Sequence, residues 1–246
     1  MEILGYSERG LINSLFYEVK CSKKKFDLIN NMLALIAFPY QKEKISFNIT
    51  KAKILIEQSF SDFGDADAVL LIENNNRKQI IFIEAKVKNC QRTCWNISKE
   101  FNKFEKGINE NKVSSSNLFV QLYHKVRLIK ALQNGSLNNL TNGINFPKCS
   151  SKRIRKIGNN QVVIKSVNEC LNYFEESFFI ALIPENMSEL KYFYNNTLRN
   201  YSPSGFHDWD TKNWGYISWG QIEDFCRSNK FIGTLKNFEW NKGQIY

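Results

Sequence analysis

The chain begins with a helical pattern of apolar residues. Five of them fall on one stripe: Leu11, Ile12, Leu15, Phe16 and Val19. This spacing predicts a helix over residues 7–20, which Ser7 can cap. A strongly apolar stretch, residues 25–38, predicts a second helix that ends at Pro39.

Three strand-like stretches follow, over residues 53–60, 67–73 and 79–87. The last two are joined through Asn74-Asn75-Asn76. Asparagine tolerates the positive φ that tight turns require, so this junction predicts a β-hairpin.

The rest of the chain alternates between helical and strand patterns. It predicts helices over residues 97–107 and 115–133, a strand at 161–165, a helix at 167–174, a strand at 178–183, a helix at 188–198, a strand at 216–218 and a helix at 219–227. Ser218 and Gln221 have the spacing of a capping box at the start of the last helix. The order of elements implies a single α/β domain over residues 1–246, with a mixed β-sheet flanked by helices (αβββαβ) and C-terminal additions.

Between Asn134 and Asn160 the pattern dissolves into Asn, Gly, Ser and Lys. A stretch of this length without structure is either functional or disordered, and we expect a basic flexible loop at 134–160. Four of its residues are basic: Lys152, Arg153, Arg155 and Lys156. They can clamp a nucleic-acid backbone, or simply form a mobile basic segment, and Lys88 is a further candidate for nucleic-acid binding.

Composition narrows the choice of partner and compartment. Apolar residues make up 43% of the chain, enough to bury a core, and the net charge of +10 favours an anionic partner, usually nucleic acid. The alternative is a merely soluble basic protein. The six cysteines form no CxxC pair and there are two histidines, so a zinc site is not supported, and scattered cysteines fit a reduced, cytoplasmic protein.

No membrane association is expected. The longest apolar run, residues 32–38, is far shorter than the ~18 residues that a membrane span needs. The N-terminus lacks the basic and apolar pattern of a signal peptide.

The second strand of the hairpin changes character near its end. Its two faces alternate: one carries Ile81, Ile83, Ala85 and Val87, and the other carries Ile80, Phe82, Glu84, Lys86 and Lys88. The second face turns from apolar to charged at Glu84, which is typical of the mouth of a cleft.

The register of the hairpin determines which acidic residues of the first strand lie opposite Glu84 and Lys86. A two-residue loop at Asn75-Asn76 places Asp67 opposite Glu84, with Cβ atoms about 4.5–5.5 Å apart, and Asp65 opposite Lys86. A slip of one residue would put the two acids on opposite faces. Without that cleft, the same residues would form a surface hairpin with a cross-strand ion pair.

Two carboxylates at this separation repel each other unless a proton or a cation lies between them. Oxygen ligands suit Mg²⁺ or Mn²⁺, and the Ala85 carbonyl can serve as a third ligand. A bound ion would polarise a phosphate and lower the pKa of a water molecule, and Lys86 would orient that water or accept its proton. The sequence therefore predicts phosphodiester hydrolysis at Asp67, Glu84 and Lys86.

This arrangement resembles the PD-(D/E)xK nuclease superfamily, which includes many type II restriction endonucleases and Holliday-junction resolvases. Asp67 opens an apolar strand and Glu84-Ala85-Lys86 closes the next, while Phe63-Gly64 matches the glycine-containing turn before the first acid. Glu8 matches by position a metal-binding glutamate of the first helix. Two features depart from the pattern: Ala66 replaces the usual proline, and Gln121 is followed at the Gln-x-x-x-Tyr spacing by Lys125.

The resemblance implies a restriction-endonuclease-like fold and a Mg²⁺-dependent DNA endonuclease of restriction, repair or mobile-element defence type, in which Mn²⁺ substitutes for Mg²⁺. Nothing in the residues excludes RNA as a substrate. A homodimer is the simple way to cut both strands. The alternative is a catalytically inactive nucleic-acid-binding or regulatory module with the same fold.

Several candidates have ordinary structural interpretations as well. The acid-x-Lys spacing recurs at residues 18–20, 189–191 and 210–212, so the tripeptide alone says little. Glu8 can bind metal or only suit the dipole of the first helix, and Asp65 can bind a second metal or water or only serve the turn. Two further pairs of candidates also have two interpretations: Gln121 and Lys125 (phosphate contact or solvated helix face), and Trp209 and Trp214 (base stacking or core aromatics). His124 is expected on the surface of a helix.

Overall fold

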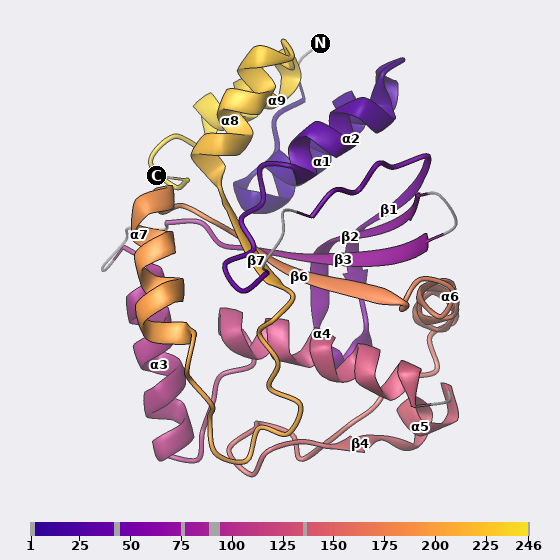
Figure 1. Ribbon diagram of the computed structural model, residues 1–246, viewed down its shortest axis with the longest axis vertical. Helices are drawn as coiled ribbons and strands as arrows, with labels where there is room; N and C mark the ends of the chain where they lie inside the picture. The colour runs from indigo at the N-terminus through magenta and orange to yellow at the C-terminus, as the bar shows by residue number, and fades with distance from the viewer. Residues whose placement is uncertain (1–2, 42–44, 75–76, 89–93, 135–136, 246) are drawn as a thin grey trace.

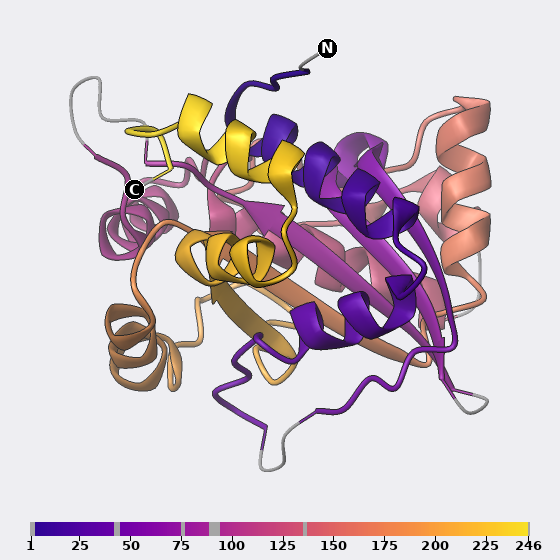
Figure 2. The same ribbon diagram turned by 90° about the horizontal axis from the view of Figure 1, so that it is seen from above.

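The computed structural model describes residues 3–41, 45–74, 77–88, 94–134 and 137–245. Its core is one β-sheet with helices on both faces, an α/β architecture as predicted (Figures 1 and 2). Four helices cover one face: α1 (Ser7–Cys21), α2 (Lys25–Leu33), α8 (Trp219–Ser228) and α9 (Ile232–Trp240). On the other face lie α3 (Ile97–Asn109) and α4 (Leu118–Gln133).

The sheet has the order β1-β2-β3-β6-β7. Its strands are β1 (Lys51–Ser59), β2 (Asp65–Asn74), β3 (Arg77–Ala85), β6 (Glu176–Ile183) and β7 (Trp214–Ser218). Strand β2 is antiparallel to both β1 and β3, whereas β6 runs parallel to β3 and β7 parallel to β6. The sheet is therefore mixed, as the order of elements predicts.

Alternate side chains of β3 enter two separate cores. Ile80 and Phe82 pack with α3 and α4, whereas Ile81, Ile83 and Ala85 pack with α1, α2 and α8. The two-faced pattern of this strand is thus confirmed, and both faces of the sheet are buried.

The N-terminal helices differ in detail from the expectation. Among the described residues, no side chain caps α1, and Ser7 has a φ of 60° inside its first turn instead of capping it. Helix α2 ends at Leu33, earlier than predicted, and a turn follows it. Ala37 then exchanges backbone hydrogen bonds of 3.0 Å with Tyr216.

The segment 134–160 is not the structureless loop that we expected. Its described residues form a short helix, α5 (Leu137–Asn142), and a two-stranded sheet of β4 (Ile144–Asn145) and β5 (Ile154–Arg155). Leu140, Phe146 and Ile157 are buried, so this segment contributes to the core under α4.

The following elements also differ in part. One helix, α6 (Gln161–Cys170), replaces the strand and helix predicted there, because Asn160 caps it and Val163 and Val167 are buried. Helix α7 (Met187–Phe193) continues as a π-helix (Tyr194–Leu198). The capping box of Ser218 and Gln221 at the start of α8 is confirmed.

Within the described ranges, the helices are too short or too polar to cross a bilayer. Cys21, Cys149, Cys170 and Cys226 are free thiols. Cys94 is disulfide-bonded, so the reduced state expected for the cysteines does not extend to it.

Candidate active site

The β2–β3 hairpin has the predicted register. Asn74 pairs with Arg77 and Ala68 pairs with Ile83, which places Asp67 and Glu84 at opposed positions. The Asn75-Asn76 loop itself lies outside the described residues. The structural premise of the candidate site is therefore present.

The two strands separate at this point, forming a fork in the sheet. Backbone pairing between β2 and β3 ends at Ala68 and Ile83, while β2 continues beside β1 and β3 continues beside β6. Asp67 Oδ2 accepts a hydrogen bond of 2.7 Å from the backbone N–H of Ala85, in place of a strand carbonyl. Opposite Asp67 on β1, Glu57 has a φ of 50°, an irregularity that often accompanies functional sites. At the fork, backbone and side-chain groups of β2 and β3 therefore lie close together without being used in pairing between these two strands.

Asp67 lies in an environment that disfavours its charge. Burial, followed by the charge of Glu84, raises the pKa of its carboxyl group to about 7. The Ala85 N–H and the charge of Lys86 act in the opposite direction, and Glu8 adds a smaller upward shift. Near neutral pH this site therefore needs a proton or a cation.

Glu84 is fully buried, and its partner is Lys125. The two side chains are 1% and 0% exposed, and Nζ of Lys125 lies 3.0 Å from Oε1 of Glu84. The ammonium also donates to the carbonyls of Phe63 and Asp65, both at 3.1 Å. The expectation that Lys125 lies on a solvated helix face is therefore wrong, because α4 packs this side chain against the fork.

Lys86 reaches the same helix one turn earlier. Its Nζ donates to Oε1 of Gln121, and both side chains are half-buried, so Gln121 does not belong to a solvated face either. The backbone of Lys86 is also fixed: its N–H donates to the Leu182 carbonyl at 2.9 Å, and its carbonyl accepts from the Trp219 indole at 2.8 Å. Sequence reasoning missed Trp219, because nothing in the pattern links the start of α8 to the end of β3.

The other two candidate acids are less closely involved. Glu8 is half-buried in the first turn of α1, where the Ser7 hydroxyl donates to its carboxylate. Its effect on the pKa of Asp67 indicates that it lies near the fork. Asp65 is exposed, and it is its backbone carbonyl that contacts Lys125.

A divalent cation fits two carboxylates and one carbonyl at the fork. Nowhere in the described part of the chain do three or more Asp, Glu, His or Cys side chains form a group that could hold a metal. Oε2 of Glu84 is buried, however, and lacks a hydrogen-bond partner among the described residues. The C=O of Ala85 points to the same edge of β3 as its N–H, toward Asp67. These oxygens are the donors that Mg²⁺ and Mn²⁺ prefer.

The turn before β2 supports the site. Gly64 has a φ of 79°, which suits glycine, and its neighbours Phe63 and Asp65 supply the carbonyls that hold Lys125. The glycine-containing turn noted in the sequence is therefore part of the framework around Glu84.

The basic cluster divides into structural and exposed members. Arg155 is 4% exposed, donates to the Asp62 carbonyl and lies 5.2 Å from the Phe146 ring, so it is not available to bind nucleic acid as expected. Lys152 pairs with Asp62 at 2.5 Å. Arg153 and Lys156 are exposed. Lys88, three residues beyond the end of β3, is half-buried.

The aromatic candidates and His124 belong to the interior. Trp214 is fully buried and Trp209 packs against it, with ring centroids 5.0 Å apart, which favours the core interpretation over base stacking. His124 is 1% exposed beside Phe146, so its assignment to the helix surface is wrong. Burial holds the pKa of its imidazole well below the usual value.

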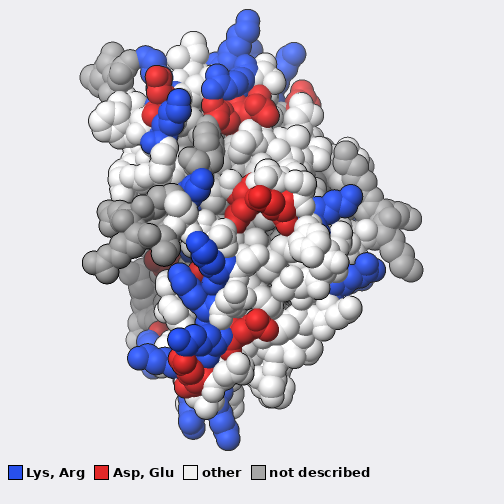
Figure 3. All heavy atoms as spheres, turned by 90° about the vertical axis from the view of Figure 1, so that its left-hand side faces the viewer, with Lys and Arg blue, Asp and Glu red and all other residues white. Residues whose placement is uncertain are grey.

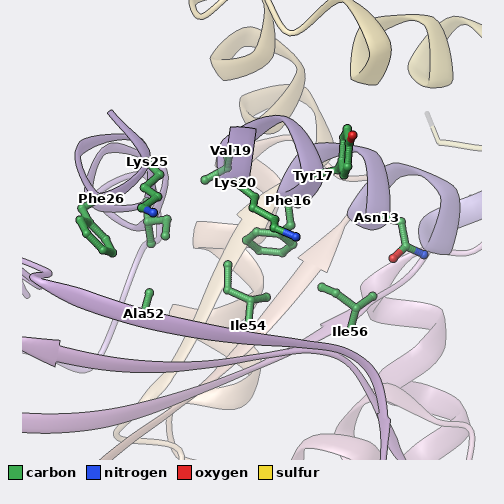
Figure 4. Close-up of a pocket in the computed structure, with 11 residues that line it drawn as sticks. Asn13, Phe16, Tyr17, Val19, Lys20, Lys25, Phe26, Ala52, Ile54 and Ile56 are labelled. Carbon is green, nitrogen blue, oxygen red and sulfur yellow. The ribbon is translucent and has the colours of Figure 1, made fainter. Parts of the chain in front are cut away.

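The remaining surface offers two further features. A groove of about 480 Å³ lies between α1, α2 and β1 (Figure 4). Its walls are mostly apolar with Lys20 and Lys25 among the lining, and the candidate site residues are not part of that lining. Strands β3 and β6 run toward the side shown in Figure 3, where basic and acidic side chains lie next to one another. Although the chain has a net charge of +10, the charged side chains coloured in that view do not form a uniformly basic surface.

Comparison with known proteins adds no assignment: no family model matches the chain, and no curated protein or solved structure does so either. The functional argument therefore depends on the geometry of the site.

Proposed function

We propose that the protein is a metal-dependent DNA endonuclease that hydrolyses phosphodiester bonds. The observation that carries this proposal is the fork, where Asp67 and Glu84 are opposed and Lys86 follows on the same strand face. A purely structural hairpin has no need to oppose two carboxylates and raise the pKa of one of them.

Each residue has a distinct role. Asp67, Glu84 and the Ala85 carbonyl would hold Mg²⁺, or Mn²⁺ in its place, and Glu8 assists from α1. Held by these residues, the ion would supply polarisation of the phosphate and a lower pKa of water. Lys86 would orient that water with its ammonium, and the hydrogen bond from this ammonium to Gln121 supports such a fixed position.

The topology supports the same proposal. A helix, three antiparallel strands, further helices and a strand parallel to β3 follow the order implied by the resemblance to PD-(D/E)xK nucleases. A net charge of +10 suits a polyanionic substrate, and the choice of DNA over RNA depends on the resemblance. A homodimer would allow both strands to be cut.

The test is cleavage of supercoiled plasmid by the purified protein with Mg²⁺ or Mn²⁺. We expect Asp67→Asn to lower the cleavage rate at least about a hundredfold, because it removes a metal ligand while keeping an acceptor for the Ala85 N–H. Glu73→Gln is the matched control, an acid-to-amide change at the far end of β2, and should leave the rate unchanged.

Two results would contradict the proposal. Cleavage that persists in Asp67→Asn would place the chemistry elsewhere. DNA binding without cleavage in either metal would favour the inactive nucleic-acid-binding module, and the absence of both would favour a regulatory role.

A further inference from the structure

The buried ammonium of Lys125 contacts oxygen atoms of three residues. These three oxygens lie within 3.1 Å: Oε1 of Glu84 and the carbonyls of Phe63 and Asp65. The two carbonyls accept hydrogen bonds from the ammonium, and the contact with Glu84 is an ion pair, so every one of these contacts is to a partner inside the protein. Because the side chain is also 0% exposed, Lys125 cannot reach a phosphate group of a bound substrate.

This ammonium bridges the two sides of the fork. Its carbonyl partners belong to the turn and the first residue of β2, and its carboxylate partner belongs to β3. The contact therefore fixes Glu84 relative to the strand that carries Asp67, although backbone pairing between these strands has already ended.

The two oxygens of Glu84 consequently face different environments. Neither oxygen has a hydrogen-bond partner among the described residues, but Oε1 forms the ion pair with Lys125, whereas no ion pair is found for Oε2 there. A carboxylate that bridges two divalent ions would need both oxygens free for metal.

We propose that Lys125 is a positioning residue that takes the place of a second divalent ion, so that the site binds a single metal ion through Asp67, the free oxygen of Glu84 and the Ala85 carbonyl. This inference rests on the proposed function, because it concerns the metal stoichiometry of that site. It also gives α4 a role, because this helix holds the positively charged Lys125 in a fixed position next to Glu84.

The first test is the stoichiometry of Mn²⁺ binding to the wild-type protein, measured by electron paramagnetic resonance of free Mn²⁺ during a titration. We expect one tight site per chain. Two sites of comparable affinity would overturn the inference.

The second test replaces the ammonium. In Lys125→Met, Glu84 becomes a buried charge without a partner, so we expect the melting temperature in EDTA to fall by roughly 10 °C. Saturating Mn²⁺ should then raise the melting temperature of Lys125→Met by more than it raises that of the wild type, because the metal supplies the missing positive charge. Lys130→Met, on the same helix but without a contact to Glu84, is the matched control and should respond as the wild type does.

If Lys125→Met does not fold, the double variant Lys125→Met/Glu84→Gln provides the test. Removing both charges should restore folding in EDTA and abolish most of the Mn²⁺-induced stabilisation. Equal Mn²⁺ responses of Lys125→Met and Lys130→Met, or a double variant no more stable than Lys125→Met, would overturn the inference.

Failure of the inference differs from failure of the proposed function. A wild-type protein that binds two Mn²⁺ ions and cleaves DNA contradicts only the role of Lys125. One that binds no Mn²⁺ and does not cleave contradicts both.

Discussion

Asp67 makes the metal-free protein sensitive to pH. Its carboxyl pKa is raised to about 7 in the folded protein from an ordinary value of 3.8. The stabilisation of the folded state by this group is complete at pH values below the pKa of the unfolded chain. It is lost as the pH rises from there toward 7, because the carboxyl group of the folded protein must then ionise.

We therefore predict that the wild type in EDTA loses about 2–3 kcal/mol of unfolding free energy between pH 5 and pH 8 through this residue. Urea denaturation at the two pH values measures it. Asp67→Asn lacks the ionisable group and should lose correspondingly less. An equal loss in both proteins would assign the pH dependence to other groups.

At the level of single residues, the sequence was sufficient to predict that Asp67 and Glu84 are opposed, but not to predict which residues surround them. Strand alternation and a two-residue loop are local, so they placed Asp67 against Glu84. The burial of His124 and Lys125 depends on packing on all sides of α4, which no local pattern states. One signal was present: apolar residues occur all around this helix, including Phe119, Val120 and Leu128, as is typical of a buried helix.

The elements around the fork are linked by a few specific contacts. Helix α8 begins at Trp219, whose indole N–H donates to the Lys86 carbonyl. This hydrogen bond joins a C-terminal helix to the end of the strand that carries the candidate catalytic lysine.

Trp219→Phe should keep most of the packing and lose this hydrogen bond. We predict a decrease in unfolding free energy of about 1–2 kcal/mol, because the partly buried Lys86 carbonyl loses its donor. The cleavage rate should fall while the apparent affinity for Mn²⁺ stays the same, since the change displaces Lys86 and not the carboxylates. Denaturation, plasmid cleavage and Mn²⁺ titration separate these effects, and unchanged cleavage would show that α8 does not position Lys86.

Elements defined by their own sequence were the ones predicted well. The β2–β3 hairpin, β6 and the capping box of α8 carry strong local signals. Helix α6 was missed because β-branched residues at 162–164 favour a strand, whereas the tertiary context buries one face of a helix. Helix α9 was not anticipated: two of its backbone N–H groups, those of Gly233 and Thr234, donate to Glu18 on α1, a contact between distant parts of the chain.

For the whole molecule, charge and burial separate residues that look alike in the sequence. Arg153 and Lys156 are exposed, whereas Arg155 between them is buried in contact with Asp62 and Phe146. The net charge of +10 suggested nucleic acid as a partner, but only the structure distinguishes which basic side chains can reach it.

We predict that Arg153→Ala weakens DNA binding and lowers the salt dependence of the logarithm of affinity by about one unit, as expected for the loss of one phosphate contact. Arg155→Ala should instead lower the unfolding free energy by about 2 kcal/mol. Fluorescence anisotropy over a range of salt concentrations and urea denaturation measure the two effects. The reverse assignment of effects would contradict this division of the cluster.

The fold class could be predicted because both faces of the hairpin strand are apolar and helices precede and follow it, which requires a sheet with two covered faces. The segment 134–160 could not, because its polar composition hides the few buried residues, such as Leu140 and Phe146, that attach it to α4.

The fork between β2 and β3 also determines which positions of the hairpin can accept substitutions without loss of folding. From Ala68 to Ile72 and from Ile80 to Ile83, every position of the hairpin has a backbone partner and belongs to one of the two cores, so substitutions there are limited by folding. Beyond Ala68 and Ile83 the two strands rely on their outer neighbours, β1 and β6, and the side chains between them are no longer needed to align the ladder. A saturation library should therefore show two regimes along the same hairpin: abundance lost before the fork, and activity lost at near-normal abundance at Asp67 and Lys86. New chemistry could arise at those positions without a new scaffold.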